Sequence, residues 1–115
     1  MERLQRFEQL KDQFRNGEQV TGGWVSIPHG EVAELTARHD YDFVCVDMEH
    51  APTDVSDLGD LVRAIDAAPG DTVPLVRVPG NDEVVLDRAL DAGVGGLMVP
   101  RIDTVADAEA VVAAS

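Results

Sequence analysis

Short apolar runs alternate with longer segments of helical periodicity along this chain. The pattern predicts helices at residues 2–16, 30–40, 55–67, 81–93 and 105–114, and strands at residues 20–27, 41–47, 72–78 and 95–100. Four strand–helix units therefore follow the first helix. Such an order is typical of an α/β fold with a parallel sheet and right-handed crossovers.

Local signals mark several of the predicted helix ends. Asp54 is placed to cap the helix that begins at residue 55, and Thr104 with Asp107 forms a capping-box pattern before the last helix. Gly93 closes the helix predicted at 81–93, where a left-handed residue commonly ends a helix. We therefore predict a single domain, 1–115, with an N-terminal helix in 1–17 and four βα units in 20–115.

Length and cysteine usage narrow the class of protein. A chain of 115 residues is long enough for one ordinary core and too short for two. No apolar run is long enough to cross a membrane, and the charged start "MERLQRFEQL" is unlike a signal peptide. Cys45 is the only cysteine, which excludes an internal disulfide. Together these features predict a cytoplasmic protein with no membrane partner.

The charge balance is strongly acidic. The chain has 22 Asp and Glu residues against 9 Lys and Arg residues, which gives a formal net charge of −13. Because phosphate backbones repel such a surface, the sequence argues against nucleic acid as a partner. Lys11 is the only lysine, in a chain rich in Ala and Val. This composition resembles that of proteins adapted to high salt, and a halophilic source is our hypothesis.

Polar residues stand at the end of every predicted strand. Ser26 follows the first strand, Asp47 to His50 follow the second, Arg77 lies near the end of the third, and Arg101 follows the fourth. The carboxyl ends of parallel strands share one face of an α/β fold, and ligands bind there. We therefore expect these side chains to converge on one pocket.

The stretch "FVCVDMEHAP" at 43–52 carries the strongest candidate chemistry. His50 is a candidate general base, with Asp47 or Glu49 orienting its ring. The alternative is a loop histidine that only caps the next helix, although three ionisable groups are costly to pack at a strand end without a task. Glu49 itself is ambiguous, because alternation along an extended chain can point it away from its neighbours.

Arg77 lies in the apolar run "PLVRVPG" and needs an anionic partner. A substrate carboxylate held by two parallel hydrogen bonds would serve, and an internal ion pair with one of the many acids agrees equally well with the sequence. Trp24, the only tryptophan, is a candidate for the pocket mouth or for the core. The sequence contains no dinucleotide fingerprint, Walker motif, zinc-like spacing or Gly-x-Ser-x-Gly element.

Two long segments match a known family. "GGWVSIPHGEVAELTARHDYDFVCVDMEHAPTD" and "PLVRVPGNDEVVLDRALDAGVGGLMVPRIDTVADAEAVVAA" resemble the metal-dependent pyruvate aldolases of the HpcH/HpaI family, the 4-hydroxy-2-oxoheptanedioate aldolases. The D-x-E-H-(A/G)-P element, the VR(V/P) strand and the LDAG…(M/I)VP segment stand in the family's order and spacing. The likeness extends from about residue 20 to the end of the sequence.

This resemblance implies a (β/α)8 barrel and a carbon–carbon lyase. Such enzymes cleave a 4-hydroxy-2-oxo acid to pyruvate and an aldehyde, with a divalent metal (Mg, Mn or Co). By position, His50 resembles the family's acid–base histidine and Asp47 its dyad partner. Arg77 resembles the arginine that holds the pyruvate carboxylate and enolate, and Trp24 falls in the first βα loop, at the substrate entrance. The resemblance also suggests a homo-oligomer.

The resemblance covers only half of such a barrel. A (β/α)8 barrel takes about 250 residues, and by resemblance its metal-binding Glu and Asp belong to the second half, so this sequence is expected to supply no metal ligand. We therefore expect the N-terminal half of an aldolase, inactive when alone. The alternative is a non-catalytic truncated remnant or an oligomerising interaction module. A small flavodoxin-like binding domain would require the strand order to reverse within the sheet.

Overall fold

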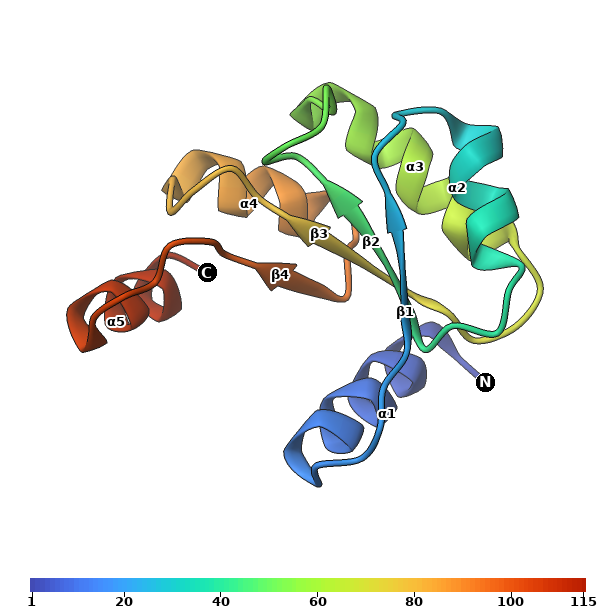
Figure 1. Ribbon diagram of the computed structural model, residues 1–115, viewed down its shortest axis with the longest axis horizontal. Helices are drawn as coiled ribbons and strands as arrows, with labels where there is room; N and C mark the ends of the chain where they lie inside the picture. The colour runs from blue at the N-terminus through green and yellow to red at the C-terminus, as the bar shows by residue number, and fades with distance from the viewer.

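The computed structural model describes all 115 residues and contains five helices and one four-stranded sheet (Figure 1). The elements in chain order are α1 (Arg3–Arg15), β1 (Gly22–Val25), α2 (Gly30–Ala37), β2 (Phe43–Asp47), α3 (Val55–Ala67), β3 (Val73–Arg77), α4 (Glu83–Asp91), β4 (Gly96–Met98) and α5 (Val105–Ala114). Every predicted element exists, and the predicted strands extend one to two residues too far at one or both ends.

The sheet is parallel throughout, and its strand order is β1-β2-β3-β4. Each strand therefore pairs with the next strand in the chain, as in the wall of a (β/α) barrel. A flavodoxin-like sheet would have its strand order reversed at a switch point. The sequential order excludes that alternative and confirms the α/β class of a partial (β/α) barrel.

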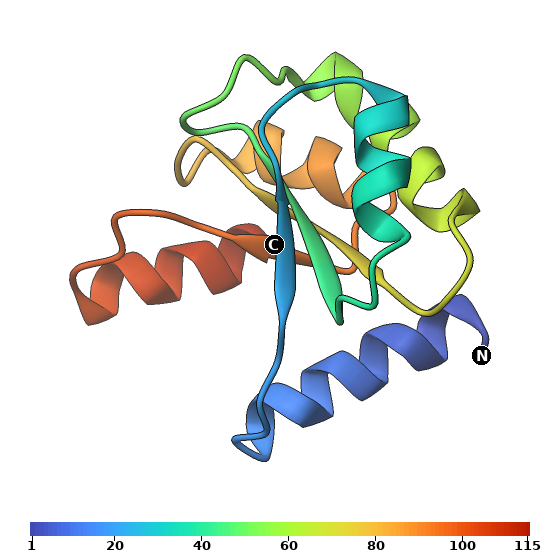
Figure 2. The ribbon, with the colours of Figure 1, turned by 45° about the vertical axis from the view of Figure 1, so that its right-hand side comes forward.

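One face of the sheet carries the hydrophobic core. Helices α2, α3 and α4 lie on this face, as the two views in Figures 1 and 2 show. Because successive strand residues point to opposite faces, Val44, Val46 and Val76 all point towards these helices and are fully buried. Helix α3 is the main helical contributor, with four buried side chains on one stripe: Leu58, Leu61, Val62 and Ile65.

The opposite face of the sheet is more open. Helix α1 runs beneath the amino-terminal ends of the strands (Figure 2) and packs against β3 and the start of β4. The approach is close: a Cβ atom on Gly95 would lie 2.9 Å from the ring of Phe7. Above α1 the face has no helical cover, so Trp24 is 42% exposed and Met98 is 38% exposed.

The predicted helix caps are present. Asp54 caps α3, Thr104 and Asp107 form the capping box of α5, and Gly93 has a φ of +95° after α4. Helix α5 follows β4 at the outer side of the sheet and has no buried residue. No helix in the structure has the length and apolarity needed to cross a membrane.

Candidate functional site

The candidate site lies at the carboxyl ends of the strands, on the open face of the sheet. Asp47, the last residue of β2, pairs in register with Arg77, the last residue of β3. Trp24 lies within β1, and not in the βα loop that the resemblance implied. It pairs with Cys45, two residues before Asp47, and so shares the face of Asp47. The alternation of the strands therefore brings three of the four predicted site residues together.

Asp47 and Arg77 form a side-on ion pair. Nε of Arg77 donates to Oδ1 of Asp47 at 3.0 Å, and Nη2 donates to Oδ2 at 2.7 Å. The Asp47 side chain is 4% exposed, and that of Arg77 is 23% exposed. A buried carboxylate needs such a partner. The internal ion pair that the sequence left open is therefore present.

Trp24 contacts both residues of this ion pair. The guanidinium carbon of Arg77 lies 4.9 Å from the centre of the Trp24 ring, which is a cation–π distance. The indole Nε1 donates to Oδ2 of Asp47 at 3.4 Å. Trp24 thus contacts both members of the ion pair and fixes the plane of the guanidinium, in addition to lying at the open face.

Asp47 also shapes the turn that follows β2. Its Oδ1 accepts the backbone N–H groups of Glu49, at 2.9 Å, and of His50, at 3.3 Å. Three donors therefore converge on one carboxylate oxygen. Short polar side chains commonly stabilise turns in this way.

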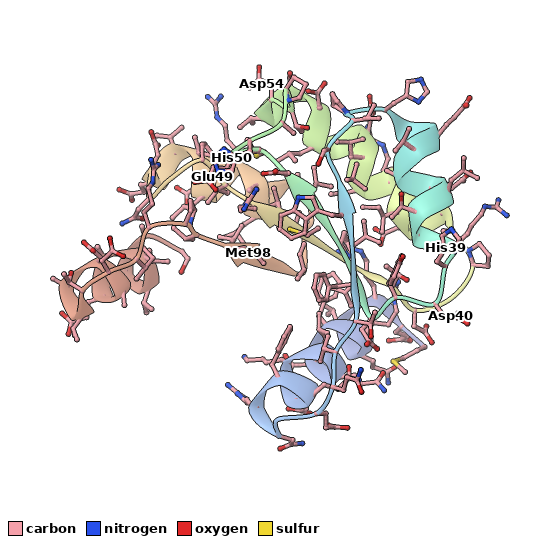
Figure 3. The ribbon with its side chains drawn as sticks, viewed as in Figure 1. His39, Asp40, Glu49, His50, Asp54 and Met98 are labelled. Atoms are coloured by element: carbon pink, nitrogen blue, oxygen red, sulfur yellow. The ribbon has the colours of Figure 1, made fainter.

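The His50 ring has a different partner from the one that the resemblance implied. Its Nε2 lies 3.2 Å from Oε1 of Glu49, whereas Asp47 contacts only the backbone of His50. The physical reason is competition: Arg77, at the register position beside Asp47, takes both oxygens of that carboxylate. Figure 3 shows Glu49 and His50 beyond the end of β2, with His39 and Asp40 at the opposite end of the strands.

Glu49 is the site residue whose direction the sequence left undecided. Its Oε1 lies 3.4 Å from Nε of Arg77, and its side chain is 12% exposed. It therefore joins the ion pair to the His50 ring. Strand alternation does not extend beyond residue 47, so no periodicity in the sequence could have given this direction.

Local charges, hydrogen bonds and burial shift three pKa values. The hydrogen bonds from Arg77 hold the pKa of Asp47 well below its usual range, against the opposing effect of burial. The hydrogen bonds that Arg77 donates to Asp47 raise the pKa of Arg77. Burial, followed by the charge of Asp47, raises the pKa of the Cys45 thiol to about 12. Asp47 and Arg77 thus stay charged across the physiological range, and Cys45 stays a thiol.

The remaining strand-end residues do not join this cluster. No hydrogen bond or ion pair connects it to Ser26, and the guanidinium of Arg101 instead donates to the carbonyl of Pro79 at 2.8 Å. Arg101 has a φ of +57°, a left-handed conformation that is uncommon outside glycine. None of the four surface cavities of the structure is lined by Trp24, Asp47 or Arg77. The cluster therefore lies on an open rim.

The residues present do not form a metal site. No group of three or more His, Cys, Asp or Glu side chains is arranged to hold an ion. The two acids of the cluster, Asp47 and Glu49, both contact Arg77, which occupies the electrostatic role that a cation would take. What the cluster offers is a fixed guanidinium beside an exposed imidazole, which suits an anionic substrate and a proton transfer.

Comparison with known proteins identifies relatives over most of the chain. Residues 21–115 match the HpcH/HpaI aldolase/citrate lyase family. A 4-hydroxy-2-oxovalerate aldolase from Novosphingobium aromaticivorans is 37% identical over 106 residues, which are 92% of this chain and 40% of the relative. A pyruvate aldolase from Rhizobium etli is 38% identical over 91% of this chain and 41% of its own length.

Solved structures agree with this relationship. An HpcH/HpaI aldolase/citrate lyase family protein from Burkholderia cenocepacia superposes with a TM-score of 0.86 at 42% identity, over 92% of this chain and 42% of that chain. Macrophomate synthase superposes with a TM-score of 0.73 at 34% identity, over 89% of this chain and 35% of its own. The chain thus spans about 40% of the length of the curated relatives it matches, and it belongs to the HpcH/HpaI aldolase/citrate lyase family.

Proposed function

We propose that this chain supplies the carboxylate-binding and proton-transferring part of a pyruvate aldolase. The reaction is the reversible cleavage of a 4-hydroxy-2-oxo acid to pyruvate and an aldehyde. The observation that carries the proposal is the Arg77 guanidinium, fixed by Asp47, Glu49 and Trp24 at the carboxyl end of the sheet. The names of the relatives, several of which are pyruvate aldolases, support the same reaction class.

Arg77 is the proposed binding group for the pyruvate carboxylate and enolate. Its Nε and Nη2 are engaged by Asp47, and its Nη1 makes no hydrogen bond within the protein. Nη1 is therefore the edge available to an anion. Because Asp47 and Trp24 restrain the guanidinium, little side-chain entropy remains to be lost when a substrate carboxylate binds.

His50 is the proposed acid–base residue, and Asp47 positions it through the backbone of the turn. The His50 side chain is 72% exposed, so a substrate can reach it. During cleavage the imidazole would take the proton of the 4-hydroxyl group, and the electrons of the breaking carbon–carbon bond would pass to the enolate. Arg77 would stabilise the negative charge of that enolate.

Enzymes of this family generally use a divalent metal, and we propose that the intact enzyme does too. The residues present here do not fit a metal site, and we propose that the metal ligands belong to another part of the barrel. We accordingly expect no cleavage by the 115-residue chain, with or without added Mg²⁺ or Mn²⁺. Robust metal-dependent cleavage would overturn that assignment.

Pyruvate binding tests the proposal without turnover. In a titration of the ¹⁵N-labelled chain with pyruvate, we expect saturable shifts of the Trp24 indole N–H and of the Arg77 Nε–H, because both lie at the proposed carboxylate site. Arg77→Lys should abolish the pyruvate-induced shift of the Trp24 indole N–H, since an ammonium cannot reproduce the planar fork of Arg77. Arg63→Lys on the exposed face of α3 is the matched control. Equal binding by the Arg77 and Arg63 variants would remove Arg77 from the site.

We also propose a self-associating protein of the cytoplasm. The open sheet supports the first part, because β1 and β4 each have an unpaired edge. The free, buried Cys45 agrees with a reducing compartment. Sedimentation velocity over a tenfold range of protein concentration tests the association, and a constant monomer mass would refute it.

A further inference from the structure

Glu49 lies between the two residues to which the proposed function assigns chemistry. A single oxygen, Oε1, is 3.2 Å from Nε2 of His50 and 3.4 Å from Nε of Arg77. The Glu49 side chain is 12% exposed, whereas that of His50 is 72% exposed. The carboxylate thus reaches from a covered position to the edge of an accessible ring.

The placement of Glu49 follows from the turn after β2. Its backbone N–H donates to Oδ1 of Asp47, which holds residue 49 directly above the strand end. From there the side chain reaches the register neighbour of Asp47, which is Arg77. A carboxylate this covered requires a positive partner, and Arg77 supplies it. Glu49 is therefore held independently of His50.

The contact with His50 bears on which ring nitrogen carries the proton. The negative oxygen of Glu49 lies 3.2 Å from Nε2, without the alignment of a hydrogen bond. Its charge favours the tautomer that carries the proton on this near nitrogen over the one that places a lone pair there. A neutral imidazole carries one proton. If a neighbour keeps that proton on one ring nitrogen, the other nitrogen is the basic atom. Neither ring nitrogen of His50 makes a hydrogen bond within the protein, so the charge of Glu49 beside Nε2 is what distinguishes the two nitrogens of this exposed ring.

We propose that Glu49 is a positioning residue that keeps the proton of neutral His50 on Nε2, leaves Nδ1 as the atom that exchanges a proton with substrate, and holds the Nε edge of Arg77. In cleavage the hydroxyl O–H bond breaks as the Nδ1–H bond forms, and the reverse transfer accompanies condensation. The inference rests on the proposed function for the identity of the reaction. The position of the proton is measurable without it.

The test is the tautomer of His50 in the 115-residue chain, measured by long-range ¹H–¹⁵N NMR at a pH where the histidines are neutral. His29 is the internal reference, because its Nδ1 accepts the N–H of Glu31 at 3.1 Å and its proton must be on Nε2. His39 makes no side-chain hydrogen bond or ion pair and represents the unconstrained mixture. We expect the two ring nitrogens of His50 to be separated in ¹⁵N shift as widely as those of His29.

Glu49→Ala should narrow that separation to the value of His39, and Glu18→Ala, which removes an exposed acid elsewhere, should leave it unchanged. An unchanged His29 spectrum verifies that the variant is folded. If Glu49→Ala does not fold, wild-type His50 compared with His39 still decides, because equal separations would overturn the proposal. Pyruvate binding that persists beside an unconstrained His50 would refute this inference alone, while a fixed tautomer without pyruvate binding would refute the proposed function alone.

Discussion

Asp47 is the residue on which the geometry of the site depends. Its carboxylate accepts hydrogen bonds from the side chains of Arg77 and Trp24 and from the backbone at residues 49 and 50. The two strand ends and the turn after β2 are therefore joined through one buried group. Neutralising that group leaves the Arg77 charge with Glu49 as its remaining carboxylate partner.

The depressed pKa of Asp47 predicts a dependence of stability on pH. Because the folded-state pKa lies below the ordinary value of 3.8, the ionised carboxylate stabilises the fold at every pH above that value. This contribution is lost as the pH falls below 3.8 towards the folded-state pKa. We expect the free energy of unfolding of Asp47→Asn to be lower than that of the wild type at pH 6, and the gap to narrow towards pH 2. Urea denaturation of the wild type and of Asp47→Asn at each pH measures the two free energies of unfolding.

Asp60→Asn is the control for that experiment, because Asp60 is an exposed acid paired with Arg63 on the surface of α3. Exposed pairs contribute little to stability. Its melts should follow those of the wild type at each pH. A gap between Asp47→Asn and the wild type that stays constant from pH 6 to pH 2 would contradict the proposed ionisation.

Cys45 is predicted to be inert in the folded protein. It is fully buried, and burial raises its pKa to about 12, so neither access nor thiolate is available at pH 8. We expect labelling by iodoacetamide at pH 8 to be suppressed at least about 100-fold relative to the chain in 6 M urea, because reaction requires unfolding. Mass spectrometry gives both rates. Labelling at comparable rates would show that β2 is accessible from the open face.

At the residue scale, the sequence could predict the direction of side chains on the strands but not of those in the turn after β2. Arg77 and Asp47 could be placed on one end of the sheet from the strand pattern, because register and alternation determine their faces. Glu49 and the ring of His50 follow the strand, where rotamers depend on the hydrogen bonds of the turn. The pairing of His50 with Glu49 could not be read from the sequence for this reason.

At the scale of elements, the sequence predicted every helix and strand and several of the helix starts. The helix starts at Asp54 and Thr104 were predictable, because caps satisfy the free N–H groups of the first turn in a recognisable pattern. The strands were predicted too long, as with β4, which covers 96–98 instead of 95–100. A strand ends where its hydrogen-bonded pairing with the neighbouring strand stops. The apolar pattern of the sequence does not show where that pairing stops.

The cap of α3 is predicted to support the whole core. Asp54 accepts the N–H of Val55 at 2.7 Å and takes part in a capping box with Asp57. Helix α3 carries four buried side chains, so unfolding of its first turn exposes core. We expect Asp54→Ala to lower the free energy of unfolding by about 1 kcal/mol, as is typical for such caps. Urea denaturation measures the loss.

Thr104→Ala is the matched comparison, because Thr104 caps α5 through the N–H of Asp107 at 3.1 Å. Helix α5 buries no residue, so its first turn can open without global unfolding. The variant should lose helical circular dichroism while its urea midpoint changes little. If the two variants lower the midpoint equally, α5 is more firmly attached than its burial indicates.

The whole molecule has one closed face and one open face. Helices α2 to α4 cover the first face (Figures 1 and 2), and the second face exposes Trp24 and Met98. Both edges of the sheet are unpaired, whereas a closed (β/α) barrel leaves no edge. The site therefore lies at the rim of an open wall, and its proposed chemistry needs further residues facing it across the barrel.

Charge is the property of the whole molecule with the clearest consequence for its stability. A net charge of −13 on 115 residues makes the folded state repel itself, and the repulsion is screened over about 10 Å at 0.1 M salt and about 3 Å at 1 M. We expect the free energy of unfolding to rise steadily as KCl increases from 0.1 M to 2 M, as measured by urea melts. Replacing the exposed acids Glu8 and Asp87 by Gln and Asn removes two charges without touching an ion pair. That variant should be more stable than the wild type at 0.1 M KCl and should gain less from added salt. A wild-type stability independent of KCl would remove the basis for a halophilic source.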